Sequence, residues 1–192
     1  MILALLAAAA CSGDCAAQKK FLDAEARVLA KPVKAQIHSH AEGSVKADAD
    51  SLLEVGVRSR LTARGSFMGT PFDKTFDQPT TPELRDALLI GLVRMGVLHN
   101  VVNLMAGQAP DHSTGGAREW LTPHDFKPLK NGVAYKLRLA AREAGEAKLY
   151  FDKRGFPELR DLLVHFPQGD MHVIETYQFS APASPPGRSP PR

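Results

Sequence analysis

The chain is poor in cysteine and tryptophan and has no large excess of either charge. Its two cysteines, Cys11 and Cys15, lie near the N-terminus, which excludes a cysteine-based zinc site and an internal disulfide framework. The 24 Lys and Arg residues stand against 21 Asp and Glu residues, and the two signs alternate along the chain. That distribution argues against a general nucleic-acid binder. At 192 residues, 44% of them hydrophobic, the sequence predicts one globular domain.

The first ten residues, Met1 to Ala10, are almost purely aliphatic. As a helix they would span roughly 15 Å, about half the hydrocarbon core of a bilayer, so they do not form a finished membrane anchor. They fit the apolar centre and small-residue end of a secretory signal that lacks a positive segment before Ile2.

Cys11 follows three alanines directly, as in a bacterial lipoprotein signal, although Ala8 stands where Leu is usual. We expect Cys11 to be the lipid-modified first residue of an exported protein held at the periplasmic side of the cell envelope. Ordinary cleavage after the A-x-A triplet and an apolar start that is no signal remain open.

Four domain segments are expected: a signal-like segment over 1–10, a tether over 11–20, one domain over 21–180 and a Pro-rich disordered tail over 181–192. Alternation of apolar and polar residues predicts one long strand from Leu53 to Phe67. Residues 65–82 read as a loop with room for one short strand near 72–76. Four further strands, over 133–142, 147–152, 158–166 and 171–179, predict an antiparallel meander.

A long apolar helix is expected from residue 81 to Met105. Thr81, Pro82 and Glu83 suit a helix start, and Gly91 and Gly96 permit close packing or a bend. A helix that is apolar on most sides must be covered, and one face of an antiparallel sheet must also be covered. The fold class expected is therefore α+β: a curved antiparallel sheet or incomplete β-barrel covered by this helix.

Several segments resemble a known family. The motifs are L-Y-F-D-K-R-G-F-P at 149–157, V-H-F-P-Q-G-D-M-H-V-I-E-T-Y at 164–177, G-L-V-R-M-G-V-L-H-N at 91–100 and P-D-H-S-T-G-G-A-R-E-W at 110–120. With the N-terminal signal, the first two motifs make the chain similar to the bacterial LolA/LppX-like outer-membrane lipoprotein carriers, and the last two make it similar to an uncharacterised branch of that family. The resemblance covers roughly residues 50–180. It implies an incomplete barrel closed by helices, with acyl chains held in the cavity.

The function expected is non-enzymatic: binding or carrying a lipid or lipoprotein acyl chain between sheet and helix. The residues expected to face that chain are Leu88, Leu92, Met95, Val102 and Met105, and the competing interpretation is that they fill a closed core. The alternative function is a membrane-anchored structural or interaction module that engages another envelope protein. No cofactor, metal or nucleic acid is expected.

Other chemistry-bearing residues are weaker candidates. His38 and His40 would lie on one face of a strand, but spacing fixes no third metal ligand. His165 and His172 flank a tight turn, and a solvated hairpin pair is the simpler reading. Asp111-His112-Ser113 holds the residue types of a hydrolytic triad without the needed spacing. Arg94, His99 and Asn103 form one polar stripe on the predicted helix, either its wet edge or a contact for a ligand headgroup.

Overall fold

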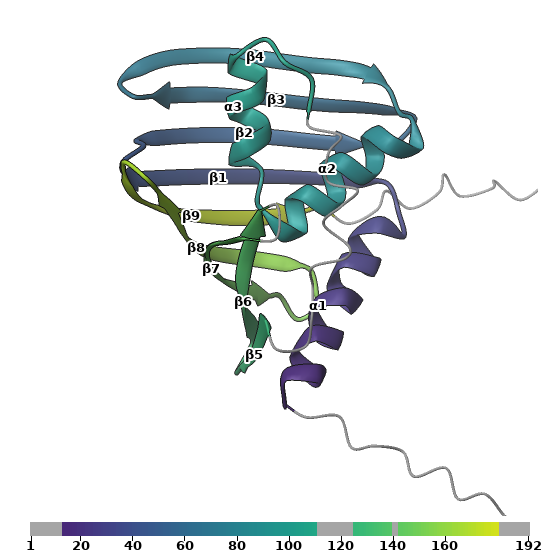
Figure 1. The fold of residues 1–192 in the computed structure, drawn as a ribbon. Coiled ribbons are helices and arrows are strands. Elements are labelled where there is room, and N and C mark those ends of the chain that lie inside the picture. Colours follow the sequence, from purple (N-terminus) through teal and green to yellow (C-terminus); the bar gives the residue numbers. More distant parts are fainter. Residues whose placement is uncertain (1–12, 111–124, 140–141, 181–192) are drawn as a thin grey trace, which may run out of the picture.

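In the part of the chain that the structure describes, the protein forms one open antiparallel sheet with three helices on one of its faces (Figure 1). The computed structural model describes residues 13–110, 125–139 and 142–180. The helices are α1 (Gly13–Leu29), α2 (Pro82–Arg94) and α3 (Leu98–Met105). The strands are β1 (Val33–Gly43), β2 (Ala47–Val55), β3 (Arg58–Phe67), β4 (Thr70–Pro79), β5 (Phe126–Leu129), β6 (Gly132–Leu139), β7 (Arg142–Phe151), β8 (Pro157–Phe166) and β9 (Gly169–Phe179).

The sheet consists of two meanders joined in the middle. Its strand order is β4-β3-β2-β1-β9-β8-β7-β6-β5, so every neighbouring pair is a hairpin except β1 with β9. That central pair runs from Ala35 opposite Phe179 to Gly43 opposite Met171. In Figure 1 the strands turn progressively from β4 to β5, so the sheet curves around the helices without closing.

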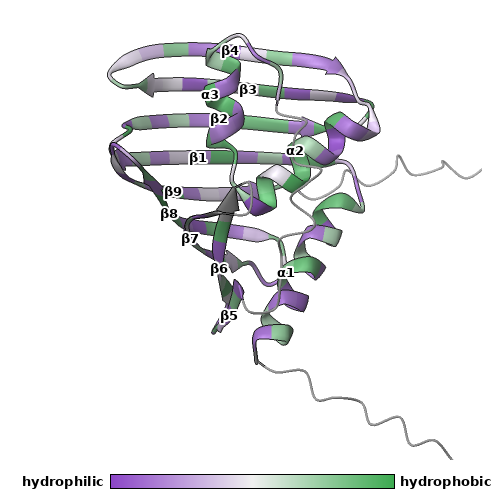
Figure 2. Cartoon of the chain, viewed as in Figure 1, coloured by the Kyte–Doolittle hydropathy of each residue, from purple (hydrophilic) through white to green (hydrophobic). Residues whose placement is uncertain are grey.

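Alternation of side chains decides which face of each strand is covered. In β1 the inward residues Ala35, Ile37, Ser39 and Ala41 are buried, and the outward residues that alternate with them are exposed. Figure 2 shows the same alternation along the neighbouring strands. Since successive side chains of a strand point to opposite faces, one face packs on the helices and the other is polar.

The expected strand from Leu53 to Phe67 is wrong. It is two strands, β2 and β3, joined by a turn at Gly56 and Val57, and Val57 is 92% exposed. Val55 and Ser59 face each other across the turn, so the period-2 pattern passes through it unbroken. The expected loop after Gly65 instead contains β4, a ten-residue edge strand whose side chains are mostly exposed. The predicted four-stranded meander is confirmed as β6 to β9.

The single long apolar helix is also wrong. Its start is confirmed, because Thr81 caps α2 by accepting a hydrogen bond from the Leu84 amide at 3.2 Å. The helix ends at Arg94, however, and Gly96 takes a φ of +89°, so that the chain turns before α3. Left-handed backbone of this kind favours glycine and interrupts a right-handed helix.

α1 extends into the segment expected to be a tether. It starts at Gly13, so residues 13–20 of the predicted tether are helical, and residues 11–12 lie outside the described residues, as do 1–10 and the tail 181–192. Phe21 of α1 is fully buried against Phe126 and Tyr135, with ring centres 5.2 and 4.9 Å away. This aromatic cluster fixes α1 to the β5–β6 end of the sheet.

Candidate functional site

An apolar pocket of about 310 Å³ lies between α3 and the sheet. We name it the α3 pocket. Its wall on the helix side comes from α3 and from Met95 just before it, and its opposite wall comes from inward-facing residues of β3, β6, β8 and β9. The lining residues are Val45, Phe67, Met95, Leu98, His99, Val102, Asn103, Leu137, Leu162, Val164, Phe166, Met171 and Val173.

The α3 pocket lies at one end of the strands. Phe67 ends β3, and Phe166 and Met171 flank the β8–β9 turn. Leu98 and Val102 are four residues apart, so they share the face of α3 that looks onto the sheet. Deep residues such as Val173 are buried, whereas Phe67, Phe166 and Met171 are only partly covered. The space is therefore lined mostly by apolar side chains and reaches the surface at this end.

Only two of the five residues expected to bind the ligand line this pocket. Met95 and Val102 do so. Leu88 and Leu92 of α2 are 0% exposed and belong to the closed core, as the competing interpretation had it. Met105 packs partly buried against that core and is not among the residues that line the pocket. The break at Gly96 explains the division, because α2 and α3 present different faces to the sheet.

The polar stripe predicted on the helix is also divided. His99 and Asn103 line the α3 pocket, and His99 Nδ1 lies 2.8 Å from the Gly96 carbonyl oxygen. Arg94 is only 2% exposed and forms a buried ion pair with Glu25 of α1, at 2.5 and 3.0 Å. Arg94 is thus neither exposed to solvent nor free to contact a ligand headgroup. It joins α2 to α1.

A buried polar network holds the elbow between α2 and α3. Arg160 on β8 donates to the carbonyl oxygens of Leu92 and Val93 at 2.6 and 2.7 Å. These carbonyl groups lie in the last turn of α2, where a helix has no amide of its own to bind them. Glu175 on β9 accepts from the amides of Val97 and Leu98 at 2.9 and 3.0 Å, at the start of α3. A cation at a helix C-terminus and an anion at a helix N-terminus both match the helix dipole.

Tyrosines complete this network. Arg160 donates to the hydroxyls of Tyr135 and Tyr177 at 2.5 and 3.0 Å, and Tyr177 donates to Glu175. Tyr135 donates to the Arg94 carbonyl oxygen at 2.7 Å. Burial raises the pKa of both tyrosines, so their hydroxyls keep the protons that these bonds need. Burial lowers the pKa of Arg160, but its tyrosine neighbours and Glu175 outweigh this and raise it above the ordinary value.

This network was missed in the sequence. Arg160 and Glu175 read as ordinary polar residues of alternating strands, yet both are 0% exposed. Ser39, also buried, donates to Glu175 at 3.1 Å. The sequence did hold one signal, the alternation of side chains along each strand. Arg160 is two residues from the inward residue Leu162, and Glu175 is two residues from the inward residue Val173, so both point inward.

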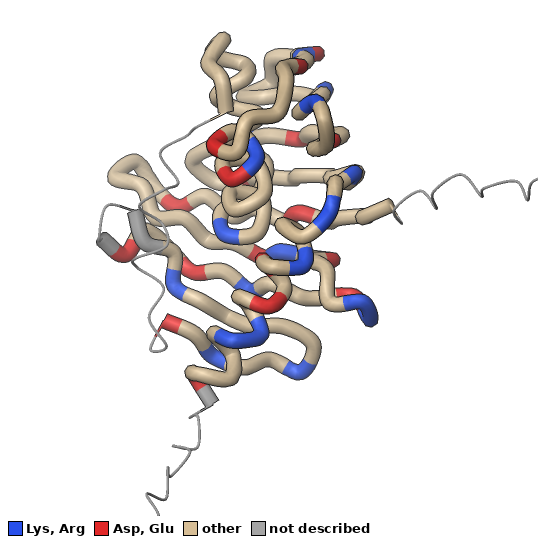
Figure 3. The backbone as a smooth tube through the Cα atoms, turned by 90° about the vertical axis from the view of Figure 1, so that its right-hand side faces the viewer, with Lys and Arg blue, Asp and Glu red and all other residues tan. Residues whose placement is uncertain are grey.

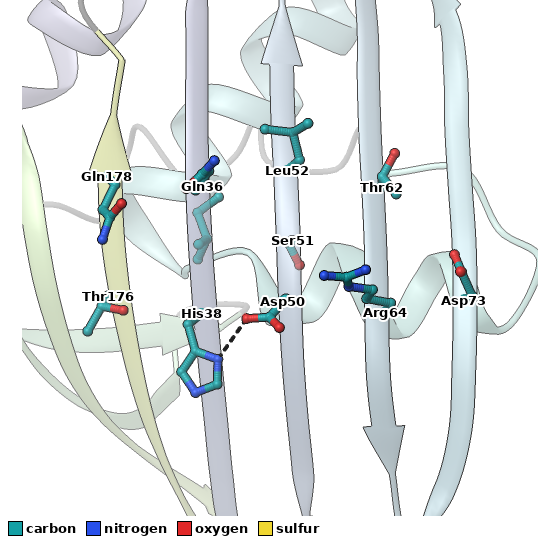
Figure 4. Close-up of a pocket in the computed structure, with 11 residues that line it drawn as sticks. Gln36, His38, Asp50, Ser51, Leu52, Thr62, Arg64, Asp73, Thr176 and Gln178 are labelled. Atoms are coloured by element: carbon teal, nitrogen blue, oxygen red, sulfur yellow. Dashed lines mark hydrogen bonds and ion pairs between the residues drawn. The ribbon is translucent and has the colours of Figure 1, made fainter.

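The outer face of the sheet carries a separate, polar hollow of about 580 Å³. Figure 4 shows its side chains spread over β9, β1, β2, β3 and β4, with the helices behind the sheet. His38 lies 3.1 Å from Asp50 across the β1–β2 pair, and Arg64 stands opposite Asp73. Side chains that spread along the strands and partly neutralise one another make a solvated surface.

The histidines expected to be candidate ligands pair with carboxylates on this outer face. His40 lies 3.1 Å from Asp48, His165 lies 2.9 Å from Asp170, and His172 lies 2.8 Å from Asp161. Among the described residues, no group of three or more His, Cys, Asp or Glu side chains is arranged to hold a metal ion.

The remaining candidates fall partly outside the described residues. Cys11 and Asp111-His112-Ser113 lie there. Cys15 is disulfide-bonded. None of the helices in the described ranges is both long enough and apolar enough to cross a membrane.

Comparison with known proteins gives no family assignment, because neither a family model nor a curated protein matches the chain. The α3 pocket and the network behind it are therefore interpreted from their own geometry.

Proposed function

We propose that the chain is a non-enzymatic cell-envelope protein that binds or carries a lipid or lipoprotein acyl chain in the α3 pocket. The observation that carries this proposal is the apolar space of about 310 Å³ between α3 and the sheet. Ligand pockets in proteins commonly measure about 300–1,000 Å³ and are mostly apolar with a few polar groups. The resemblance to LolA/LppX-like lipoprotein carriers is part of the same proposal.

The lining of the α3 pocket suits an alkyl chain. Met95, Met171 and Phe166 are adaptable or aromatic side chains, and each methylene transferred from water onto such a surface contributes about 0.8 kcal/mol. Binding of this kind needs exclusion of water and no catalytic group. His99 and Asn103 are the polar groups of the lining, so they are the residues that would contact the polar end of the ligand.

Export and anchoring through Cys11 belong to the proposal as a separate element. The chain has only two cysteines, Cys11 and Cys15, and a Cys11 sulfur that carries a lipid is not available for a disulfide. Intact mass of protein isolated from membranes, measured before and after alkylation, separates the two forms. An added diacylglyceryl mass supports the anchor, and a disulfide with no added lipid overturns it.

The central experiment is to purify the full chain gently and record native mass spectra, then extract and identify any bound lipid. The substitution Val102→Trp fills the α3 pocket from α3, and Val57→Trp at an exposed turn is the matched control. We expect bound lipid in the wild type and the control, and at least ten-fold weaker binding of a fluorescent fatty acid by Val102→Trp. Equal binding by all three proteins, or none by any of them, overturns the proposal.

One observation favours the alternative of an interaction module. β4 is an edge strand of ten residues whose outer backbone groups have no neighbouring strand in the described sheet. Pro71 and Pro79 near its ends and the charged residues between them discourage strand pairing, so the α3 pocket stays the favoured site. Recovery of a stoichiometric envelope protein with a lipid-free chain would favour the module.

A further inference from the structure

A hollow lined by basic residues lies at the end of the strands opposite the α3 pocket. It encloses about 490 Å³. The β7–β8 turn contributes to it, whereas the α3 pocket includes residues beside the β8–β9 turn, at the other end of β8. We name it the basic hollow. Its lining residues are Lys20, Ala24, Arg27, Asn131, Phe151, Asp152, Lys153, Arg154 and Gly155.

The charge of the basic hollow is mostly uncompensated. Four cations and one carboxylate line it, and that carboxylate, Asp152, is bonded to Arg154 at 2.9 Å. In the stretches of chain that the structure describes, no carboxylate forms an ion pair with Lys20, Arg27 or Lys153. Lys20 lies over an aromatic ring instead, with Nζ 5.5 Å from the centre of Phe151.

Hydrogen bonds to Asp152 hold the turn that carries two of these cations. Burial raises the pKa of Asp152, but hydrogen bonds from the Phe156 amide and from Arg154 outweigh this and hold it below the ordinary value. Gly155 has a φ of +81°, and a Cβ atom there would overlap the guanidinium of Arg27. Arg27 of α1 is thus held against the β7–β8 turn. The cations come from two elements and converge on one concave site.

We propose that the basic hollow docks the protein on a membrane surface by binding the phosphate groups of anionic phospholipids. A concave group of fixed cations beside exposed lysines suits phosphate oxygens. The twelve residues after Ser180 add two arginines and no acid, and the Arg154 side chain contacts the Phe179 carbonyl oxygen at 3.1 Å, where that segment begins. The choice of a membrane as the partner rests on the envelope location in the proposed function.

A nucleic acid is the less favoured partner. Its backbone needs an extended basic track, and elsewhere on this chain the two charge signs are interspersed, as Figure 3 shows along the backbone. The basic hollow is instead a compact site. Docking there leaves the α3 pocket, at the far end of the strands, directed away from the membrane.

The test uses the full chain and co-sedimentation with vesicles of phosphatidylcholine alone or with phosphatidylglycerol at about 30%. The variants are Arg27→Glu and Lys153→Glu. The matched control is Lys74→Glu on β4, which makes the same change in net charge at the opposite edge of the sheet. Because a basic residue near an anionic surface contributes about a five-fold change in partitioning, each variant should lose at least five-fold of the preference for anionic vesicles. The control should lose less than two-fold.

Several results overturn this proposal. They are equal binding to both vesicle types, an equal loss in the Lys74→Glu control, full displacement by millimolar inorganic phosphate, or stronger retention on single-stranded DNA than on vesicles. Thermal unfolding of each variant verifies that it is folded. Fatty-acid binding to the α3 pocket is measured on the same proteins, so failure of docking with intact fatty-acid binding sinks this inference alone.

Discussion

Gly96 leaves room for the carboxylate of Glu175. A Cβ atom at residue 96 would overlap that carboxylate, and Gly96 also has a φ of +89°. The contact places the start of α3 within reach of Glu175, which accepts hydrogen bonds from the Val97 and Leu98 amides. The elbow between α2 and α3 is therefore set by a glycine and a buried acid on different elements.

Replacing Gly96 should lower the free energy of unfolding more than replacing another glycine of similar backbone conformation. Gly96→Ala introduces both left-handed strain, about 1–3 kcal/mol, and overlap with Glu175. Gly107→Ala is the control, because Gly107 has a φ of +72° with nothing within 4 Å of the added atom. Urea unfolding of both variants gives the comparison. Equal losses of stability would show that the overlap is relieved without cost.

Neutralising Glu175 should destabilise the fold strongly. Glu175→Gln removes the buried negative charge next to Arg160, whose Nε lies 3.5 Å from Oε2, and breaking a buried pair costs about 3–5 kcal/mol. Asp23→Asn breaks the exposed pair with Lys19 and should cost less than about 1 kcal/mol. The free energy of unfolding is measured for each. A loss below 1 kcal/mol for Glu175→Gln would mean that its hydrogen bonds suffice without the charge.

Leu88 and Val102 should respond oppositely to truncation. Leu88→Ala leaves a cavity in the closed core and should cost about 2–5 kcal/mol of stability while fatty-acid affinity stays unchanged. Val102→Ala should cost less stability and alter fatty-acid affinity, because Val102 lines the α3 pocket. Chemical denaturation and a fluorescent fatty-acid titration test both variants. An affinity change confined to Leu88→Ala would contradict this assignment.

Asn100 should be a site where a substitution stabilises the protein. It is 1% exposed, and neither its Oδ1 nor its Nδ2 has a hydrogen-bond partner among the residues that the structure describes. An unsatisfied buried amide costs about 1–3 kcal/mol, so Asn100→Leu should raise the free energy of unfolding by about 1 kcal/mol. Asn103→Leu, at a half-buried position of the same helix, should change it by less than about 0.5 kcal/mol. Lower stability of Asn100→Leu in calorimetry would contradict the argument.

His165 should titrate above the ordinary value of a histidine. Its hydrogen bond to Asp170 raises the pKa, so the stabilising effect of the pair is complete below the unfolded-state pKa and is lost as the pH rises through the folded-state pKa. Asp170→Asn should return the pKa to about 6.5. Proton NMR titration of the His165 ring measures both values. An unchanged pKa in the variant would show that Asp170 is not the cause.

Much of the fold could be predicted because local pattern and tertiary arrangement agree. The meander from β6 to β9 and the Thr81 cap are local features that their residues specify. The turn at Gly56 was missed because the alternation keeps its phase there, and the break at Gly96 was missed because the apolar residues continue across it. Both depend on backbone conformation, which hydropathy does not record.

The candidate site was predictable only in part, for a different reason. Met95 and Leu92 have the same apolar character, and only the elbow places one in the α3 pocket and the other in the core. Arg160 and Glu175 look like surface residues until the pairing of β8 with β9 brings them together. The helix groups that they bind, at Leu92, Val93, Val97 and Leu98, lie 67 to 78 residues away in the chain, and a single sequence does not show that contact.

The network around Arg160 and Glu175 also limits where the elbow can sit. If the elbow slid along the sheet, the helix ends would leave their partners, and two charges would remain in apolar surroundings far from water. The free-energy cost of leaving these charges unpaired in other positions of the helices fixes where the helices lie on the strands. This cost is larger than the stability that the pair adds in the observed position. Since α3 forms one wall of the α3 pocket, this fixed register also determines the size of the pocket.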